Sequence, residues 1–226
     1  DCAADPFYNT NTNSGKKSIF PSASVEIPVS GKKIISTGEQ GWSFRELNHL
    51  RIKRQLTEKT RIEFEALTAL MAILVHSSNL SGQQKIFVQN KSDKLAKGYV
   101  HDLGSIMGAQ YSLVGFSYSK GDLKNWLEFP LWSKASKCVL ALKFHGKNYF
   151  SPDKIRITES GRRFLQERLK SLVSSPVYGD KRLRLLLTYA KFESVDEDSP
   201  GIEGWVAAFK EKVKELEKTP CPDGLI

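Results

Sequence analysis

The sequence predicts an α+β protein with a helical core, short antiparallel strands and an amphipathic helix near its C-terminus. The chain has 226 residues with 40% apolar content, which is enough to build a core. Several stretches repeat apolar residues at helical spacing behind a capping residue, and several shorter ones alternate apolar with polar residues. These patterns together indicate a mixed class rather than an all-helical or all-strand protein.

The first part of the chain is expected to hold a polar arm followed by short strands. Residues 1–17 are rich in Asn and Thr and have no hydrophobic period, so we expect a flexible arm. Between residues 18 and 37, short stretches alternate apolar and polar residues between Pro and Gly, as strands or a hairpin would. Pro21 and Pro28 indicate edge positions because proline cannot donate to a neighbouring strand.

Two helices are predicted next. Ser43 and Glu46 fit a capping box, which predicts a helix that ends near Leu56. Thr60 and Glu63 repeat the pattern, and the helix after them has apolar residues on nearly every side. We therefore expect this second helix to be the buried centre of the domain.

The middle of the chain is expected to continue with a strand and a helix. Residues 85–89 have the composition of a strand, and Ser92 with Asp93 could cap a helix. The apolar residues that would share one face of this helix are Leu95, Tyr99, Leu103 and Met107.

Further strands and a helix are predicted downstream. Residues 110–118 and 138–144 are apolar at every second position, which indicates strands with one buried face. Pro130 interrupts any helix between them. Residues 154–158 form another candidate strand. The helix after it should run to about Val173, and its candidate caps are Thr158 and Ser160.

The C-terminal third ends in the clearest helix of the chain. Residues 180–192 fit both strand and helix spacing, and we favour a helix. Residues 193–203 contain five acidic residues and no Lys or Arg, as an acidic hinge would. Ser199 could cap the last helix, whose apolar stripe consists of Ile202, Trp205, Phe209, Val213 and Leu216.

This organisation predicts four parts. They are an N-terminal arm at 1–17, a main mixed domain at 18–192, an acidic hinge at 193–203, and a C-terminal docking helix and tail at 204–226.

The chain is basic, with a net charge of +9 and a pI near 9.4, and much of this excess lies in two clusters. Clustered cations are the footprint of a nucleic-acid-binding surface. The residues predicted to contact phosphates are Arg51, Lys53, Arg54, Lys59 and Arg61 in the first cluster, and Lys154, Arg156, Arg162, Arg163, Lys170, Lys181, Arg182 and Arg184 in the second.

Helical spacing predicts how three cations of the second cluster are arranged on the helix surface. Arg162, Arg163 and Lys170 fall on one arc of the predicted helix, and Leu165 and Leu169 fall on the opposite arc. A guanidinium can hold a phosphate through two hydrogen bonds. The alternative is an ordinary solvated helix face, which shows the same pattern.

Tyr149 and Phe150 are candidate stacking platforms for unpaired bases, because they occur in a predicted loop near Lys147 and Lys154. Packing in the core is the alternative for both rings.

The stretch from Ile155 to Leu165, which contains T-E-x-G-R-R-F-L, resembles the end of the wing and the following helix in winged-helix DNA-binding domains. About a dozen residues carry the likeness. In that family basic wing residues reach the DNA backbone. The resemblance implies backbone contacts by Lys154, Arg156, Arg162 and Arg163. The segment before the predicted hairpin, where the family has its recognition helix, is interrupted by Pro130.

No enzyme signature is recognisable in the sequence. We find no phosphate-binding loop, dinucleotide motif, nucleophile elbow or paired metal-binding histidines. We therefore expect no catalytic residues, no cofactor and no metal.

The cysteines and the apolar runs bear on location. Cys2, Cys138 and Cys221 are odd in number and far apart, which predicts neither a disulfide framework nor a metal site, and favours a reducing compartment. The longest apolar run, residues 66–75, is too short for a transmembrane segment. We expect an intracellular protein of the cytoplasm, the nucleus or a virion.

These observations predict a protein that binds RNA or DNA mainly through the phosphate backbone. It could coat RNA or single-stranded DNA as a multimer, as a nucleocapsid protein does, with the arm and the last helix mediating self-association. One alternative is a winged-helix-type replication or transcription factor that binds DNA. Another is a structural interaction protein that binds an acidic protein or an anionic membrane surface.

Overall fold

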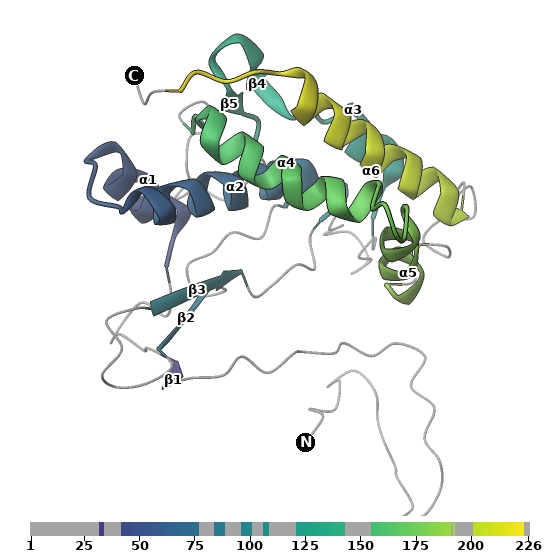
Figure 1. Cartoon of the computed structure of the whole chain (residues 1–226), viewed down its shortest axis with the longest axis horizontal. Coiled ribbons are helices and arrows are strands. Elements are labelled where there is room, and N and C mark those ends of the chain that lie inside the picture. The colour runs from purple at the N-terminus through teal and green to yellow at the C-terminus, as the bar shows by residue number, and fades with distance from the viewer. Residues whose placement is uncertain are drawn as a thin grey trace, which may run out of the picture. The chain divides into compact units, whose positions relative to one another are not determined.

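The computed structural model has a mixed α and β fold that is mostly helical (Figure 1). The residues that it describes are 32–33, 42–76, 84–88, 96–100, 106–108, 121–142, 155–190, 192 and 201–223. The predicted arm at 1–17, the strand at 110–118 and the stacking candidates Tyr149 and Phe150 lie outside these residues.

The first two helices are α1 (Phe44–Ile52) and α2 (Glu58–Leu74). The predicted capping box is confirmed, since Ser43 Oγ accepts from the Glu46 amide at 3.1 Å and Glu46 Oε2 accepts from the Ser43 amide at 2.8 Å. The cap of α2 is Thr57 rather than Thr60: Thr57 Oγ1 accepts a hydrogen bond from the amide of Thr60 at 3.2 Å. The predicted burial of α2 is confirmed, because Ala69 and Ile73 are fully buried.

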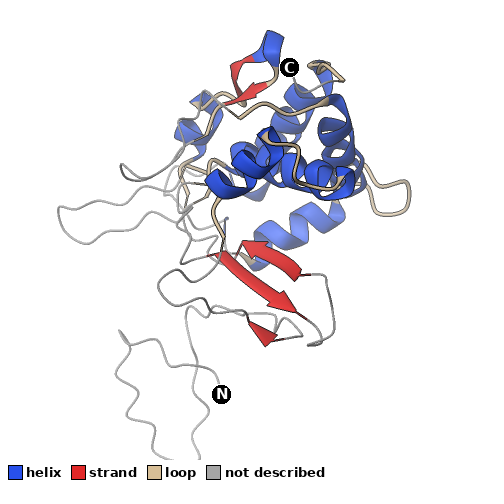
Figure 2. Cartoon of the chain, turned by 90° about the vertical axis from the view of Figure 1, so that its left-hand side faces the viewer, coloured by secondary structure: helices blue, strands red, loops and turns tan. Residues whose placement is uncertain are grey.

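A three-stranded antiparallel sheet follows the order β1-β2-β3 (Figure 2). Its strands are β1 (Lys32–Lys33), β2 (Gln84–Val88) and β3 (Ala96–Val100). β2 confirms the strand predicted there. β3 contradicts the helix predicted after Asp93, because the segment pairs with β2 from Gln84↔Val100 to Val88↔Ala96. Glycine weakens a helix, whereas Tyr and Val favour strands, so the backbone pairing prevails over the helical spacing of the apolar residues.

The middle of the chain forms α3 (Leu123–Glu128), β4 (Trp132–Lys134), the 3₁₀ turn η2 (Ala135–Lys137) and β5 (Val139–Leu140). α3 ends before Pro130, as predicted. The strand predicted at 138–144 is present only as β5, and residues 138–142 are all buried instead of alternating. β5 also bridges to the segment before the next helix, where Val139 pairs with Arg156.

The last three helices are α4 (Glu159–Val173), α5 (Lys181–Tyr189) and α6 (Gly201–Lys218). The predicted cap of α4 is confirmed, because Thr158 Oγ1 accepts from the amide of Gly161 at 3.4 Å. The helix favoured for the α5 segment is also confirmed. α6 packs against α3, α4 and α5 (Figure 1). Its apolar stripe, from Trp205 to Leu216, is buried in its own chain, which leaves no such stripe for a neighbouring protomer.

Trp126 lies at the centre of the core and joins three helices. Its ring stacks on Trp205 of α6 with centroids 5.8 Å apart. Its Nε1 donates to the backbone carbonyl of Ile73 at 2.7 Å. That carbonyl belongs to the last turn of α2, where helical carbonyls have no partner within the helix. Trp126 therefore both fills the core and satisfies a buried helix end.

Among the helices in the described part of the chain, none combines the length and the apolar character needed to cross a bilayer.

Candidate functional site

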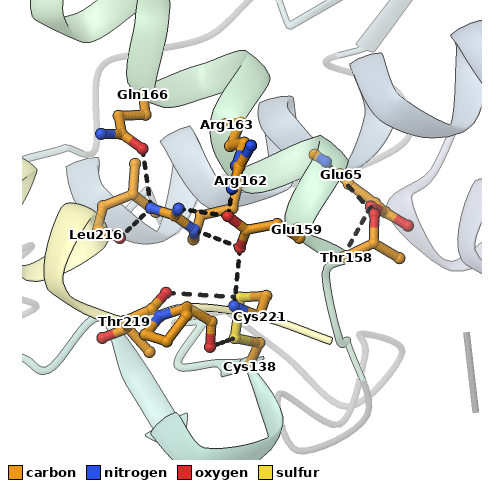
Figure 3. The surroundings of a disulfide bond; sticks show 12 residues. Glu65, Cys138, Thr158, Glu159, Arg162, Arg163, Gln166, Leu216, Thr219 and Cys221 are labelled. Atoms are coloured by element: carbon orange, nitrogen blue, oxygen red, sulfur yellow. Dashed lines mark hydrogen bonds and ion pairs between the residues drawn. A yellow bond between two sulfur atoms is a disulfide. The ribbon is translucent and has the colours of Figure 1, made fainter. Parts of the chain in front are cut away.

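The start of α4 lies between α2 and α6, and two buried carboxylates hold the three helices together (Figure 3). The first is Glu65, which is fully buried in α2. Its Oε2 accepts hydrogen bonds from the Thr158 amide at 2.9 Å and from Thr158 Oγ1 at 2.6 Å. Gly161 allows this approach, because a Cβ there would lie 2.6 Å from the Cβ of Glu65.

Two arginines of the first basic cluster neutralise Glu65. Arg61 Nη1 lies 3.1 Å from each carboxylate oxygen, and Arg51 Nη1 lies 3.3 Å from Oε1. Arg51 also donates to the backbone carbonyl of Arg156 at 2.6 Å. Burial lowers the pKa of Arg51, and the charge and hydrogen bond of Glu65 oppose that shift. Arg51 is a buried structural cation, which corrects its prediction as a surface phosphate contact.

The second carboxylate is Glu159, in the first turn of α4. Arg162 donates to it through Nη2 at 2.6 Å and Nε at 2.8 Å, and Arg163 donates through Nε at 2.7 Å. The amide of Cys221 donates a further bond at 2.8 Å. The hydrogen bond from Arg162, followed by those from Cys221 and Arg163, lowers the pKa of Glu159 to about 2 despite its burial.

Arg162 is buried, and its remaining donors are used inside the protein (Figure 3). Its Nη1 donates to the side-chain oxygen of Gln166 at 2.9 Å and to the carbonyl of Leu216 at 3.0 Å. The prediction that Arg162 faces solvent beside Arg163 and Lys170 is therefore wrong. Helical angles place the three cations on one arc, but α6 packs against α4 there and covers Arg162.

A disulfide joins Cys138 to Cys221 beside this cluster, with their Cα atoms 5.6 Å apart (Figure 3). The expectation that the cysteines form no disulfide is wrong. They are 83 residues apart in sequence, and the tail after α6 brings them together next to β5. Disulfides persist in oxidising environments, so the cysteines do not support a reducing compartment. The cysteines therefore no longer support the predicted intracellular location, which stays a prediction.

A third carboxylate, Asp180, neutralises cations near the start of α5. Arg184 Nε lies 2.7 Å from its Oδ1, and Lys210 of α6 pairs with its Oδ2. The bonds from Arg184 and then Lys210 lower the pKa of Asp180 to about 2. Arg184 also pairs with Glu203. The Arg184 guanidinium therefore has two carboxylate partners within its own chain.

The predicted phosphate contacts consequently fall into separate groups. Arg61, Arg163 and Arg184 are partly or largely accessible but bind carboxylates, and Lys59 is exposed with its Nζ 4.0 Å from Glu63 Oε1. Arg156 is half-buried, and Lys154 lies outside the described residues. Of the predicted phosphate contacts, those that are exposed and form no side-chain hydrogen bond or ion pair within the described part of the chain are Lys53, Arg54, Lys170, Lys181 and Arg182. Within that part of the chain, the expected continuous strip of cations is interrupted by Glu65, Glu159 and Asp180.

One cavity brings the first cluster to the start of α4. It has a volume of about 390 Å³ and is lined by Arg51, Arg54, Leu56, Glu58, Arg61, Thr158 and Asp223. Arg54 follows α1 in a left-handed conformation with φ 56°, and its side chain is exposed. The two clusters thus meet in part, at Arg51 and Arg156, while the cations of α5 belong to a different group around Asp180.

Sequence reasoning missed Glu65 and Thr158 as organisers of this region. A signal existed, because Glu65 stands among apolar residues in a helix that was itself expected to be buried. A buried carboxylate requires a cationic partner. The arginines nearby in sequence could have been assigned to it.

In the described part of the chain, no group of three or more His, Cys, Asp or Glu side chains is arranged to hold a metal ion. Comparisons of the chain with family models, with curated proteins and with solved structures found no match.

Proposed function

We propose that the chain binds nucleic acid through backbone phosphates at the cavity between the α1–α2 turn and the start of α4. The observation that carries this proposal is a cavity of about 390 Å³ lined by the exposed Arg54 and by Arg61, whose lining also includes the buried cation Arg51. Cavities lined by several guanidinium groups suit phosphate, because each guanidinium can donate two parallel hydrogen bonds.

The cations of this cavity have different roles in the proposal. Arg54 and Lys53 just before it have exposed side chains that form no hydrogen bond or ion pair among the described residues, so they are available to a ligand. Arg61 is held in place by Glu65 and Thr158, which fixes its direction before a ligand arrives. Arg51 contributes charge rather than a free hydrogen-bonding face.

The carboxylates at the cavity limit how many phosphates it can bind. Glu58 and Asp223 line it as well, and they offset part of its positive charge. We therefore propose a short contact with a few phosphates and weak sequence preference, whose affinity depends on counterion release. A multimeric, nucleocapsid-like coat would have to assemble through residues other than the apolar stripe of α6, which is buried.

Fluorescence anisotropy with single-stranded RNA, single-stranded DNA and duplex DNA across a salt series tests the proposal. The double variant Lys53→Gln, Arg54→Gln should weaken binding and reduce the salt slope by about two phosphate equivalents. The matched control is Lys134→Gln, Lys137→Gln, which removes two exposed lysines from the β4–η2 segment. Equal slopes for both double variants, or no binding by the unmodified chain, would exclude this cavity.

A competition assay separates the two nucleic-acid proposals. Indifference to sequence supports the backbone-binding protein. A strong preference for one duplex over random duplexes supports the DNA-binding factor implied by the winged-helix resemblance.

A further inference from the structure

α5 carries apolar side chains on two opposite sides. Leu183 and Leu187 are buried on the side that faces the core, where α5 packs against α4 and α6. Arg182, Leu185, Leu186 and Tyr189 recur at i, i+3, i+4 and i+7, so they form a second stripe on the outer side. A helix that needed only to cover the core would carry polar residues there.

The outer stripe continues onto the turn before α5. Val177 is 77% exposed and Tyr189 is 79% exposed, and Tyr178, Leu185 and Leu186 are exposed as well. Seven large apolar side chains are exposed in the described part of the chain, and five of them lie on this turn and helix. Exposed apolar residues scattered singly are ordinary, whereas a group of this kind marks an interaction surface. We call these five residues the α5 face.

Two cations border the α5 face without a carboxylate to neutralise them. Lys181 and Arg182 are exposed and form no ion pair within the described residues. The nearest carboxylate in sequence, Asp180, is occupied by Arg184 and Lys210. The guanidinium carbon of Arg182 lies 4.5 Å from the centre of the Tyr178 ring, which places a charge beside the apolar surface. A complementary partner must therefore be apolar and anionic together.

We propose that the α5 face docks on an anionic phospholipid surface. Val177, Leu185 and Leu186 would enter the boundary between headgroups and acyl chains, and the two tyrosines would lie at headgroup level. Lys181 and Arg182 would extend to the lipid phosphates while their alkyl stems cover apolar surface. The nine residues of α5 are too few to span a bilayer, so the contact is peripheral.

The same observations disfavour other occupants. Two copies of the chain meeting through this face would bury Lys181 and Arg182 of both copies in one interface, where the α5 face has no carboxylate to pair with them. Nucleic acid could use the cations and the tyrosines, but exposed Leu and Val side chains offer no hydrogen-bond donor or acceptor to phosphates or base edges. A lipid surface uses all of these side chains at once.

Vesicle flotation of the full oxidised chain tests the proposal. The chain should float with equimolar phosphatidylcholine and phosphatidylserine and remain unbound with phosphatidylcholine alone. Lys181→Gln and Arg182→Gln should each weaken partitioning by about fivefold, because one cation near an anionic surface contributes about that factor. Leu186→Gln should weaken it by about tenfold through lost apolar burial.

Matched controls identify the surface. Leu127→Gln replaces a leucine that is 48% exposed, against 58% for Leu186, and should leave partitioning unchanged. Lys53→Gln, Arg54→Gln should also float normally, which keeps this test independent of the nucleic-acid proposal. The proposal is overturned if the chain fails to float with either vesicle, which would leave an acidic, amphipathic protein as the occupant. It is also overturned if Leu127→Gln loses as much binding as Leu186→Gln.

Discussion

The guanidinium of Arg162, in the first turn of α4, donates a hydrogen bond to the backbone carbonyl of Leu216, in the last turn of α6, at 3.0 Å. Carbonyls in the last turn of a helix have no partner within it and favour a nearby cation. The same guanidinium binds Glu159, which also accepts from the Cys221 amide. Arg162 thus joins two helix ends and the tail after α6 through one side chain.

Replacing Arg162 should destabilise the fold. Arg162→Ala would leave Glu159 buried with fewer donors and the Leu216 carbonyl without its partner, so we expect the free energy of unfolding to fall by about 3 kcal/mol. Arg163→Ala is the matched control, because Arg163 binds the same carboxylate but is 70% exposed, and should cost less than about 1 kcal/mol. Urea denaturation measures both. Similar losses for the two variants would contradict the buried role of Arg162.

Gly161→Ala should also be destabilising. Alanine normally stabilises an exposed helix position relative to glycine by about 1 kcal/mol. Here its Cβ would lie 2.6 Å from both the Cβ and Oε2 of Glu65, so α4 and α2 would have to separate. We expect the free energy of unfolding to fall by about 2 kcal/mol. Ser160→Ala, one position earlier, tests propensity alone, and a stabilised Gly161→Ala protein would refute the close approach.

Removing the disulfide should lower stability while leaving the helices able to form. Cross-linking residues 83 apart restricts the unfolded chain, which corresponds to about 4.5 kcal/mol in the chain-entropy account. Cys138→Ser, Cys221→Ser should therefore unfold at lower urea concentration, and the unmodified chain should match it after reduction. Cys2→Ser is the control. If reduction did not change the urea midpoint, the bond would not contribute to stability.

Acid should lower the free energy of unfolding as the pH falls from 4.5 to about 2. The pKa of Glu159 is about 2 in the folded chain against 4.5 ordinarily, so its ionised form stabilises the fold above pH 4.5. That contribution is lost progressively as the pH falls from 4.5 to about 2. Glu159→Gln should be less stable at neutral pH and should show a flatter pH dependence in this range. Glu58→Gln, at an exposed position, should keep the slope of the unmodified chain.

The features predicted correctly depend on neighbours in sequence. The Ser43 capping box, the Thr158 cap and the Trp205 to Leu216 stripe each involve residues within a few helical turns, so their spacing alone specifies them. The helix expected at β3 is wrong because the apolar spacing considers that segment alone, whereas its backbone pairs with the separate strand β2.

The candidate site was harder to predict than the fold. Arg162, Arg163 and Lys170 look alike on a helical projection, yet only Arg162 is covered by α6. Whether a cation meets solvent or a carboxylate depends on which helix returns over it, and that information is not local. The disulfide was not predicted for the same reason. Its cysteines meet only because the tail after α6 returns to β5.

The disulfide also constrains how the protein is made. Cys221 is translated 83 residues after Cys138, so α3 to α6 have all been synthesised before the bond can close. Until then Cys138 has no Cys221 thiol to pair with. The native bond therefore cannot restrict the chain while α4, α5 and α6 are being synthesised.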